Sequence, residues 1–167
     1  MEIVAQIIGI LAMIINISSF QCKKNRNLFL MIGIGSTLFS INFLMLGAYV
    51  SAIYNIISII RSALTQNEKF FNKKSFYFLC VLYVVGTVFA YDNPWSIVLF
   101  IAQIVQTYFM WFTGGGAIRK SQVYFISPAW LINNIIVGSI GGILCEVFIM
   151  SSAVISYFRF KKTGFEK

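Results

Sequence analysis

Residues 28–60, LFLMIGIGSTLFSINFLMLGAYVSAIYNIISII, contain no charged residue, and this stretch decides the fold. As a single helix it would be about 50 Å long at roughly 1.5 Å per residue. The hydrocarbon core of a bilayer is only about 30 Å thick, so we expect the stretch to fold back once. The break is predicted at residues 47–51, GAYVS, because Gly47 is flexible and Tyr49 suits a membrane interface.

The second half of the chain contains a similar stretch, residues 121–158, whose single charge is Glu146. Its break is predicted at residues 138–142, GSIGG. With the other apolar runs, these two hairpins give an all-α integral membrane protein with seven transmembrane helices. The predicted helices are residues 3–20, 28–47, 48–64, 76–91, 96–113, 122–138 and 139–160.

Composition and charge agree with this topology. Hydrophobic residues make up 59% of the chain, charged residues only 11%, and the mean hydropathy is +0.83. If the N-terminus lies outside, all thirteen Lys and Arg residues fall on the cytoplasmic side, as the positive-inside rule requires. The net charge of +8 could suggest nucleic acid, but these residues lie in short loops, where anionic lipid headgroups are the better partner. We therefore expect a cytoplasmic C-terminus and no nucleic-acid partner.

An internal repeat appears when the chain is shifted by 91 residues. Helices two and three then superpose on helices six and seven, with Asn42 on Asn133 and Gly47 on Gly138. The single membrane domain, residues 1–167, is therefore predicted to hold three-helix units at residues 1–66 and 96–160. A single linker helix at residues 76–91 would give both units the same orientation, as in parallel-repeat transporters. The same shift places Asn55 on Glu146.

Two segments carry a family resemblance: NNIIVGSIGGILCE at residues 133–146, and LMLGAY at residues 44–49, followed by Asn55 and Arg61. With them, the chain resembles the bacterial inner-membrane YgjV family over most of its length, which implies localisation in the inner membrane. The three-plus-one-plus-three plan is similar to that of the SWEET and SemiSWEET sugar facilitators and the PnuC vitamin transporters. In SWEET proteins a symmetry-related Asn pair contacts the sugar, and the resemblance gives Asn55 and Glu146 that position. A Glu in place of one Asn departs from the sugar pattern.

Polar residues inside the predicted helices are the candidates for a site. Glu146 is the only carboxylate within the apolar segments, and it could bind a solute, carry a proton or form a static hydrogen bond. The third helix presents a stripe of Ser51, Asn55, Ser58 and Ser62 on one face, which should face other helices or a hydrated cavity. Helix packing is the competing interpretation for each of these polar groups. The predicted substrate-binding residues are Asn55, Ser58, Gln103, Gln106, Trp130 and Glu146.

These features favour a small-solute facilitator or transporter with a central polar site between the two units. The alternative is a non-transporting receptor or assembly factor on the same plan. Enzymatic activity is not expected, because the chain has no histidine and no pattern that pairs a nucleophile with a base. No cofactor and no metal are predicted, and a homo-oligomer is left open. Arg61 is expected to extend its side chain to the cytoplasmic interface.

Overall fold

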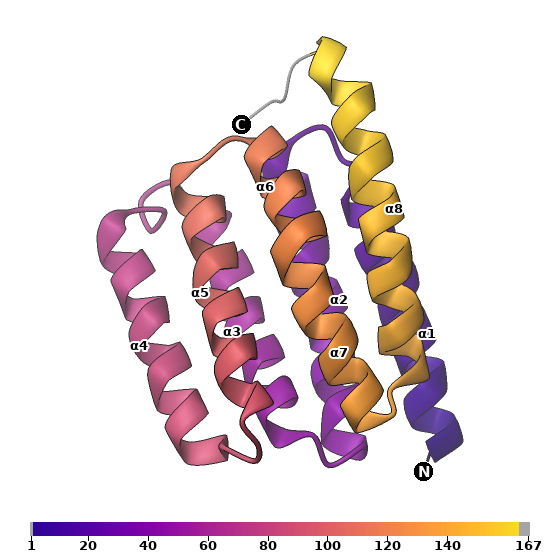
Figure 1. The fold of residues 1–167 in the computed structure, drawn as a ribbon. Helices are drawn as coiled ribbons and strands as arrows, with labels where there is room; N and C mark the ends of the chain where they lie inside the picture. Colours follow the sequence, from indigo (N-terminus) through magenta and orange to yellow (C-terminus); the bar gives the residue numbers. More distant parts are fainter. Residues whose placement is uncertain (1, 164–167) are drawn as a thin grey trace.

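The computed structural model describes residues 2–163, and every regular element in that range is helical (Figure 1). The N-terminal Met1 and the C-terminal Lys167, on which the topology prediction also depends, lie outside the described residues. The elements are α1 (Glu2–Ser19), α2 (Asn25–Met45), α3 (Tyr49–Thr65), α4 (Lys73–Ala90), α5 (Trp95–Phe112), α6 (Gly115–Ser121), the π-helical η1 (Gln122–Ile126), α7 (Ser127–Val137) and α8 (Ile140–Thr163).

Both predicted hairpins are confirmed. Gly47 separates α2 from α3 with φ 73°, and Gly138 separates α7 from α8 with φ 74°, a left-handed conformation that favours glycine. After the first glycine, the Ala48 N–H donates to the Phe43 carbonyl at 2.9 Å; after the second, the Ser139 N–H donates to the Asn134 carbonyl at 3.0 Å. These six-to-one bonds are typical of the Schellman motif, which satisfies the last carbonyls of a helix. Both helices therefore end in the same way.

Several predicted boundaries are wrong by a few residues; α2 begins at Asn25 rather than residue 28, and α8 ends at Thr163 rather than residue 160. The fourth helix begins at Lys73 rather than residue 76, because the Asn72 side chain caps it by accepting a hydrogen bond from the Ser75 N–H. Arg119 and Lys120, predicted to lie in a loop, belong to α6. This short helix continues without interruption through η1 into α7, so α6, η1 and α7 form one rod.

The π-helical turn has a local cause in Pro128, the second residue of α7. Proline lacks the N–H that an α-helix needs, and its ring collides with the carbonyl four residues earlier. A widened turn directly before the proline relieves both problems. The widening leaves Gln122 and Ile126 buried on the inner side of the rod.

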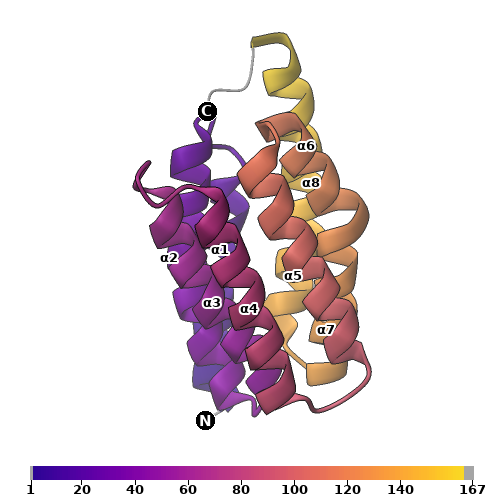
Figure 2. The ribbon, with the colours of Figure 1, turned by 90° about the vertical axis from the view of Figure 1, so that its left-hand side faces the viewer.

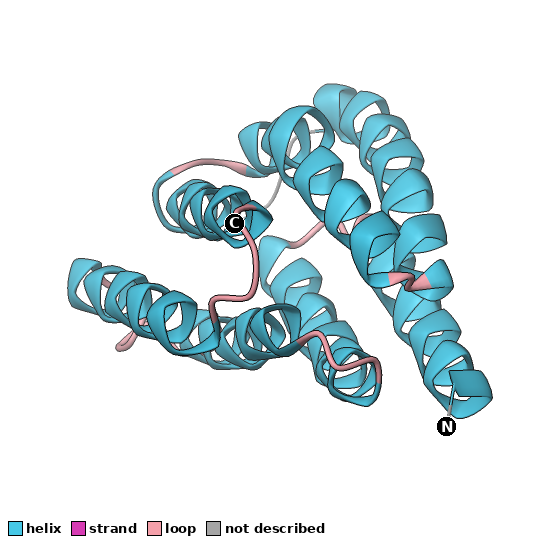
Figure 3. Cartoon of the chain, turned by 60° about the horizontal axis from the view of Figure 1, so that its bottom comes forward, coloured by secondary structure: helices cyan, strands magenta, loops and turns pink. Residues whose placement is uncertain are grey.

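The helices form a ring that follows the order of the chain. Each successive helix packs against the next, α5 contacts α7, and α8 closes the ring against α1. Within this ring, α4 packs against α3 and α5. Figure 3, in which the lower end of the molecule comes forward, shows the helices side by side around the bundle. From the side, α1–α3 and the α5–α8 helices form two groups that run the length of the molecule (Figure 2). We call α1–α3 the first unit and α5–α8 the second unit.

Glycines permit the closest helix contacts. A Cβ atom on Gly141 of α8 would lie 2.7 Å from the Gly9 carbonyl carbon of α1, so the two backbones touch at the seam that closes the ring. A Cβ atom on Gly33 of α2 would lie 2.6 Å from the Ser62 side chain of α3. Neither position has room for a larger side chain.

Among the described residues, four helices are long and apolar enough to cross a membrane: Asn25–Met45, Lys73–Ala90, Trp95–Phe112 and Ile140–Lys161. Two shorter apolar helices are Ile3–Ser19 and Tyr49–Thr65. Large apolar side chains cover the outside of the bundle; Val88 and Phe89 of α4, for example, are 72% and 84% exposed. Such a surface is suited to contact with lipid tails rather than water.

Candidate functional site

A polar cavity lies inside the ring. Every helix except α4 and α6 contributes to its lining, together with η1. Its volume is about 60 Å³, measured as the space open to the centres of water molecules. Because one water needs only about 10–15 Å³ on this measure, the cavity has room for several waters or one small solute.

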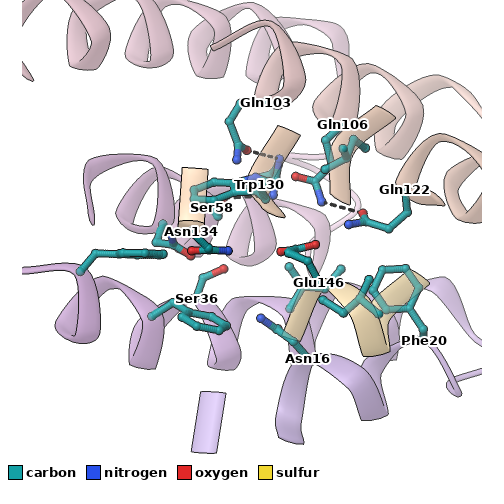
Figure 4. A pocket seen from close by; sticks show the side chains of 17 residues that line it. Asn16, Phe20, Ser36, Ser58, Gln103, Gln106, Gln122, Trp130, Asn134 and Glu146 are labelled. Atoms are coloured by element: carbon teal, nitrogen blue, oxygen red, sulfur yellow. Dashed lines mark hydrogen bonds between the residues drawn. The ribbon is translucent and has the colours of Figure 1, made fainter. Parts of the chain in front are cut away.

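All six predicted binding residues line this cavity (Figure 4). They come from four separate elements, so the fold collects side chains that are distant in the sequence. The binding role of these residues stays a prediction. The six residues are Asn55 and Ser58 of α3, Gln103 and Gln106 of α5, Trp130 of α7 and Glu146 of α8.

The polar stripe on α3 faces inward, as predicted. Ser51, Asn55, Ser58 and Ser62 are all buried, with at most 8% of any residue exposed. Asn55 and Ser58 reach the cavity, while Ser51 accepts a hydrogen bond from Asn133 and Ser62 packs against α2. One stripe therefore combines both readings that the sequence left open, cavity lining and helix packing.

Glu146 projects into the middle of the cavity (Figure 4). It is 9% exposed, and within residues 2–163 its Oε2 atom has no hydrogen-bond partner. The Ser127 hydroxyl on the neighbouring helix interacts with the same carboxyl group. A buried carboxyl group with a free oxygen is costly in an apolar environment unless water or a solute completes its hydrogen bonds.

The prediction for Arg61 is wrong, because its side chain does not extend to the interface. The residue is 1% exposed and lines the cavity. Its terminal nitrogens donate to the Gln103 Oε1 atom at 3.2 Å, the Thr107 Oγ1 atom at 3.2 Å and the Ser58 Oγ atom at 3.0 Å. Helical side chains lean toward the N-terminus of their helix, and Ser58 lies one turn back from Arg61 on α3. The Arg61 side chain therefore points toward the bundle centre, where these oxygens lie. The Nε atom of Arg61 has no partner.

Sequence reasoning missed several further polar groups at the cavity. Asn16 of α1 and Asn134 of α7 both line it, and in each the Oδ1 atom is buried without a partner. Ser36 of α2 and Gln122 of η1 complete the polar lining. The internal repeat contains one signal for Ser36, because a shift of 91 residues places it on Ser127, whose hydroxyl interacts with Glu146.

Gln122 owes its inward position to the π-helical turn. Its Oε1 atom accepts a hydrogen bond from Gln106 at 3.4 Å, and its Nε2 atom donates to the Ser127 hydroxyl at 2.9 Å. Figure 4 shows Gln106 and Gln122 joined at one side of the cavity. Pro128 therefore influences the site, because the turn it requires connects α5 with the residue that interacts with Glu146.

Hydrogen bonds between the units close the bundle beside the two hairpins. In one direction, Asn42 of α2 accepts from the Ser139 hydroxyl, directly before α8, at 3.2 Å. In the other, Asn133 of α7 donates to the Ser51 hydroxyl at the start of α3, at 2.9 Å. Asn42 and Asn133 occupy the same position in the repeat, so each unit uses the same asparagine to hold the other.

Arg119 closes the opposite end. It is fully buried and donates to the Phe20 and Cys22 carbonyls beyond α1, to the Gly115 carbonyl of α6, and to the Ser156 hydroxyl of α8. Free carbonyls at a helix C-terminus carry partial negative charge, which a guanidinium stabilises. This arginine joins helices at the bundle end, whereas Arg61 faces the cavity.

Comparison with known proteins agrees with the resemblance seen at residues 133–146. A family model described as "Bacterial inner membrane protein", Imp-YgjV, matches residues 3–164. The "Inner membrane protein YgjV" of Escherichia coli strain K12 is 26% identical over 168 residues, covering 97% of this chain and 88% of that protein. No solved structure matches.

Proposed function

This chain belongs to the Imp-YgjV family of bacterial inner membrane proteins, and we propose that it is a small-solute facilitator or transporter. The single observation that carries the proposal is the cavity inside the ring, where Arg61, Glu146, Asn16 and Asn134 each have a buried polar atom without a partner. Buried polar groups are normally satisfied, and groups that are not satisfied mark water or ligand sites. Helix packing accounts for Asn16 and Asn134, whose Oδ1 atoms lie against Gly35 and Gly142, but it gives no reason to bury an arginine and a glutamate beside one space.

We also propose that the two units form a three-plus-one-plus-three plan of the SWEET type, with α4 as the linker. The equivalent hairpins support this, since Gly47 and Gly138 share one conformation and one pattern of cap bonds at a shift of 91 residues. The reciprocal bonds of Asn42 and Asn133 support it as well. Under this plan the cavity lies between the units, where parallel-repeat transporters hold their substrates.

In the proposed topology the chain crosses the membrane seven times, with the N-terminus outside and the C-terminus in the cytoplasm. The lipid bilayer and an unidentified small polar solute are the proposed partners, assembly into a homo-oligomer is compatible with the plan, and no enzymatic activity is proposed. A reporter fused after Lys167 should be active only in the cytoplasm. Activity of this fusion outside the cytoplasm would contradict the seven-helix topology.

The test of function begins with the purified protein in detergent, screened against a library of polar metabolites by thermal unfolding. A ligand that binds the folded state raises the melting temperature. At a concentration of a hundred times its dissociation constant, it adds about 2.7 kcal/mol to the free energy of unfolding. Compounds that stabilise the protein are then tested for flux into proteoliposomes. Solute-dependent flux supports the proposal, whereas stabilisation without flux favours the alternative, a receptor or assembly factor.

A further inference from the structure

Two oppositely charged residues face the same small cavity without pairing to each other. We propose that the cavity selects small zwitterionic solutes, with the solute carboxylate at Arg61 and the solute ammonium group at Glu146. This inference rests on the proposed function, because it names the class of solute for the same cavity. It separates this protein from a sugar carrier, for which neutral hydrogen-bonding side chains would be sufficient.

The positive side of the cavity is Arg61. The three hydrogen bonds it makes within the described chain all go to neutral oxygens, those of Ser58, Gln103 and Thr107. A buried guanidinium that meets only neutral acceptors lacks a counter-charge, which is costly in a medium of low dielectric constant. Its Nε–H has no partner among the described residues. A carboxylate is the group that a guanidinium binds best, through charge and a matching planar geometry.

The negative side is Glu146, on α8 in the second unit. Among the described residues, its Oε2 atom has no partner. The Oδ1 atoms of Asn16 and Asn134 also have no partner, but they lie against Gly35 and Gly142 of neighbouring helices and do not face the cavity. In Figure 4 the Glu146, Asn16 and Asn134 side chains surround a common space, together with Ser36. An ammonium group has three N–H donors and no acceptor. The Glu146 carboxylate therefore supplies both the acceptor and the counter-charge that an ammonium group needs.

The depths of the two charges also fit a small molecule. Glu146 superposes on Asn55 in the repeat, and Arg61 lies six residues beyond Asn55 on α3, about 9 Å by helical rise. The Arg61 side chain recovers part of that difference because it reaches back to Ser58. Its guanidinium then lies roughly one helical turn, about 5 Å, beyond Glu146 in the direction of the C-terminal end of α3. The cavity volume of about 60 Å³ restricts the solute to a few heavy atoms.

Other solute classes leave a charge uncompensated. A neutral polyol would hydrogen-bond to both sides but neutralise neither Arg61 nor Glu146. A simple anion would pair with Arg61 alone, and a simple cation with Glu146 alone. Only a molecule that carries both charges compensates both groups at once. Discrimination between solutes should therefore depend on the presence of two charges rather than on the number of hydrogen bonds.

The test compares simple probes on the purified wild-type protein by calorimetric titration. The zwitterions are glycine, β-alanine and γ-aminobutyrate, in which the separation of the charges increases step by step. Acetate and methylammonium represent the separate charges, and glucose represents a neutral polyol. We expect at least one zwitterion to bind at least tenfold more tightly than acetate, methylammonium or glucose. Equal binding of acetate or methylammonium, or binding of glucose alone, would overturn the inference, and neither result depends on whether a variant folds.

Variants then assign the two ends. Arg61→Gln and Glu146→Gln should each weaken binding of the best zwitterion at least tenfold. The matched controls Lys69→Gln and Glu68→Gln remove the same charges from exposed positions and should bind as the parent does. Unchanged zwitterion binding in both cavity variants would contradict the assignment. If no zwitterion binds but another metabolite shows flux, the inference fails while the proposed function stands; if no metabolite binds or shows flux, both fail.

Discussion

Replacing Arg61 with methionine tests whether this arginine serves the cavity or holds the fold together. The change removes three hydrogen bonds that involve a charged donor, worth about 1.5–3 kcal/mol each. It also removes the desolvation penalty of a buried cation, several kcal/mol in real proteins. Two of the three partners keep another bond: the Gln103 Oε1 atom still accepts from Tyr83, and the Thr107 hydroxyl still donates to the Gln103 carbonyl. We therefore expect a net change within about 2 kcal/mol of zero.

Arg119→Met is the matched control, because it removes the same charge from an equally buried arginine. The Arg119 guanidinium donates hydrogen bonds to the Phe20 and Cys22 carbonyls beyond α1. The substitution removes this donor from both carbonyls. Each carbonyl left without a partner costs about 1–3 kcal/mol, so the loss should reach about 2–6 kcal/mol. The guanidinium also lies over the Phe160 ring, 5.4 Å from its centroid, and this contact is lost as well.

The assay is thermal unfolding of the parent and both variants in one detergent, followed by solute titration. For a chain of this size each kcal/mol corresponds to about 2–4 °C. Arg119→Met should melt clearly below Arg61→Met, while Arg61→Met should lose solute binding at a melting temperature near that of the parent. A greater loss of stability in Arg61→Met than in Arg119→Met would refute the reasoning, because Arg61 would then be a structural residue.

Three other substitutions have defined expectations in the same unfolding assay. Glu146→Gln should change the free energy of unfolding by less than about 1 kcal/mol, since its Oε2 atom has no partner; a loss of about 3–5 kcal/mol would indicate a buried structural ion pair. Gly141→Val should lower the free energy of unfolding by about 1–3 kcal/mol or more, because the new Cβ would meet the α1 backbone. The Cβ of Gly114→Ala enters open space, so this variant should be nearly neutral. Gly47→Ala and Gly138→Ala should each cost about 1–2 kcal/mol for their left-handed backbone, and a clear difference between them would count against equivalent hairpins.

The helices and hairpins could be predicted because they follow from two features of the sequence: the lengths of the apolar runs and the positions of the glycines within them. A charge-free run of residues 28–60 is too long for one crossing, and Gly47, the glycine nearest its middle, can adopt the left-handed turn that a reversal needs. The start of α4 was missed for a local reason, since the cap at Asn72 adds a first turn that hydropathy does not register. The short α6 was missed because two basic residues, Arg119 and Lys120, suggested a loop.

The candidate site was only partly predictable. Its six predicted residues were found because a polar side chain in an apolar helix must face inward, and all six line the cavity. Asn16 and Asn134 have the same polarity and lie in equally apolar helices, but sequence alone does not show which inward-facing amides bond to a neighbouring helix and which remain unpartnered. Asn133 and Asn134 are adjacent, yet the first bonds to Ser51 and the second lines the cavity.

Arg61 shows why the charged half of the site needed the structure. The positive-inside rule counts an arginine near the end of a helix as an interfacial residue, and by count Arg61 satisfies that rule. However, an arginine side chain is long enough to point either way along its helix, and the outcome depends on what each direction offers. Toward the bundle centre, Gln103 and Thr107 of α5 provide acceptors, and they reach Arg61 only because the two units pack against each other. Burial of Arg61 is therefore a property of the assembled bundle, and so is the placement of Arg61 and Glu146 at one cavity, on which selection of a zwitterion depends.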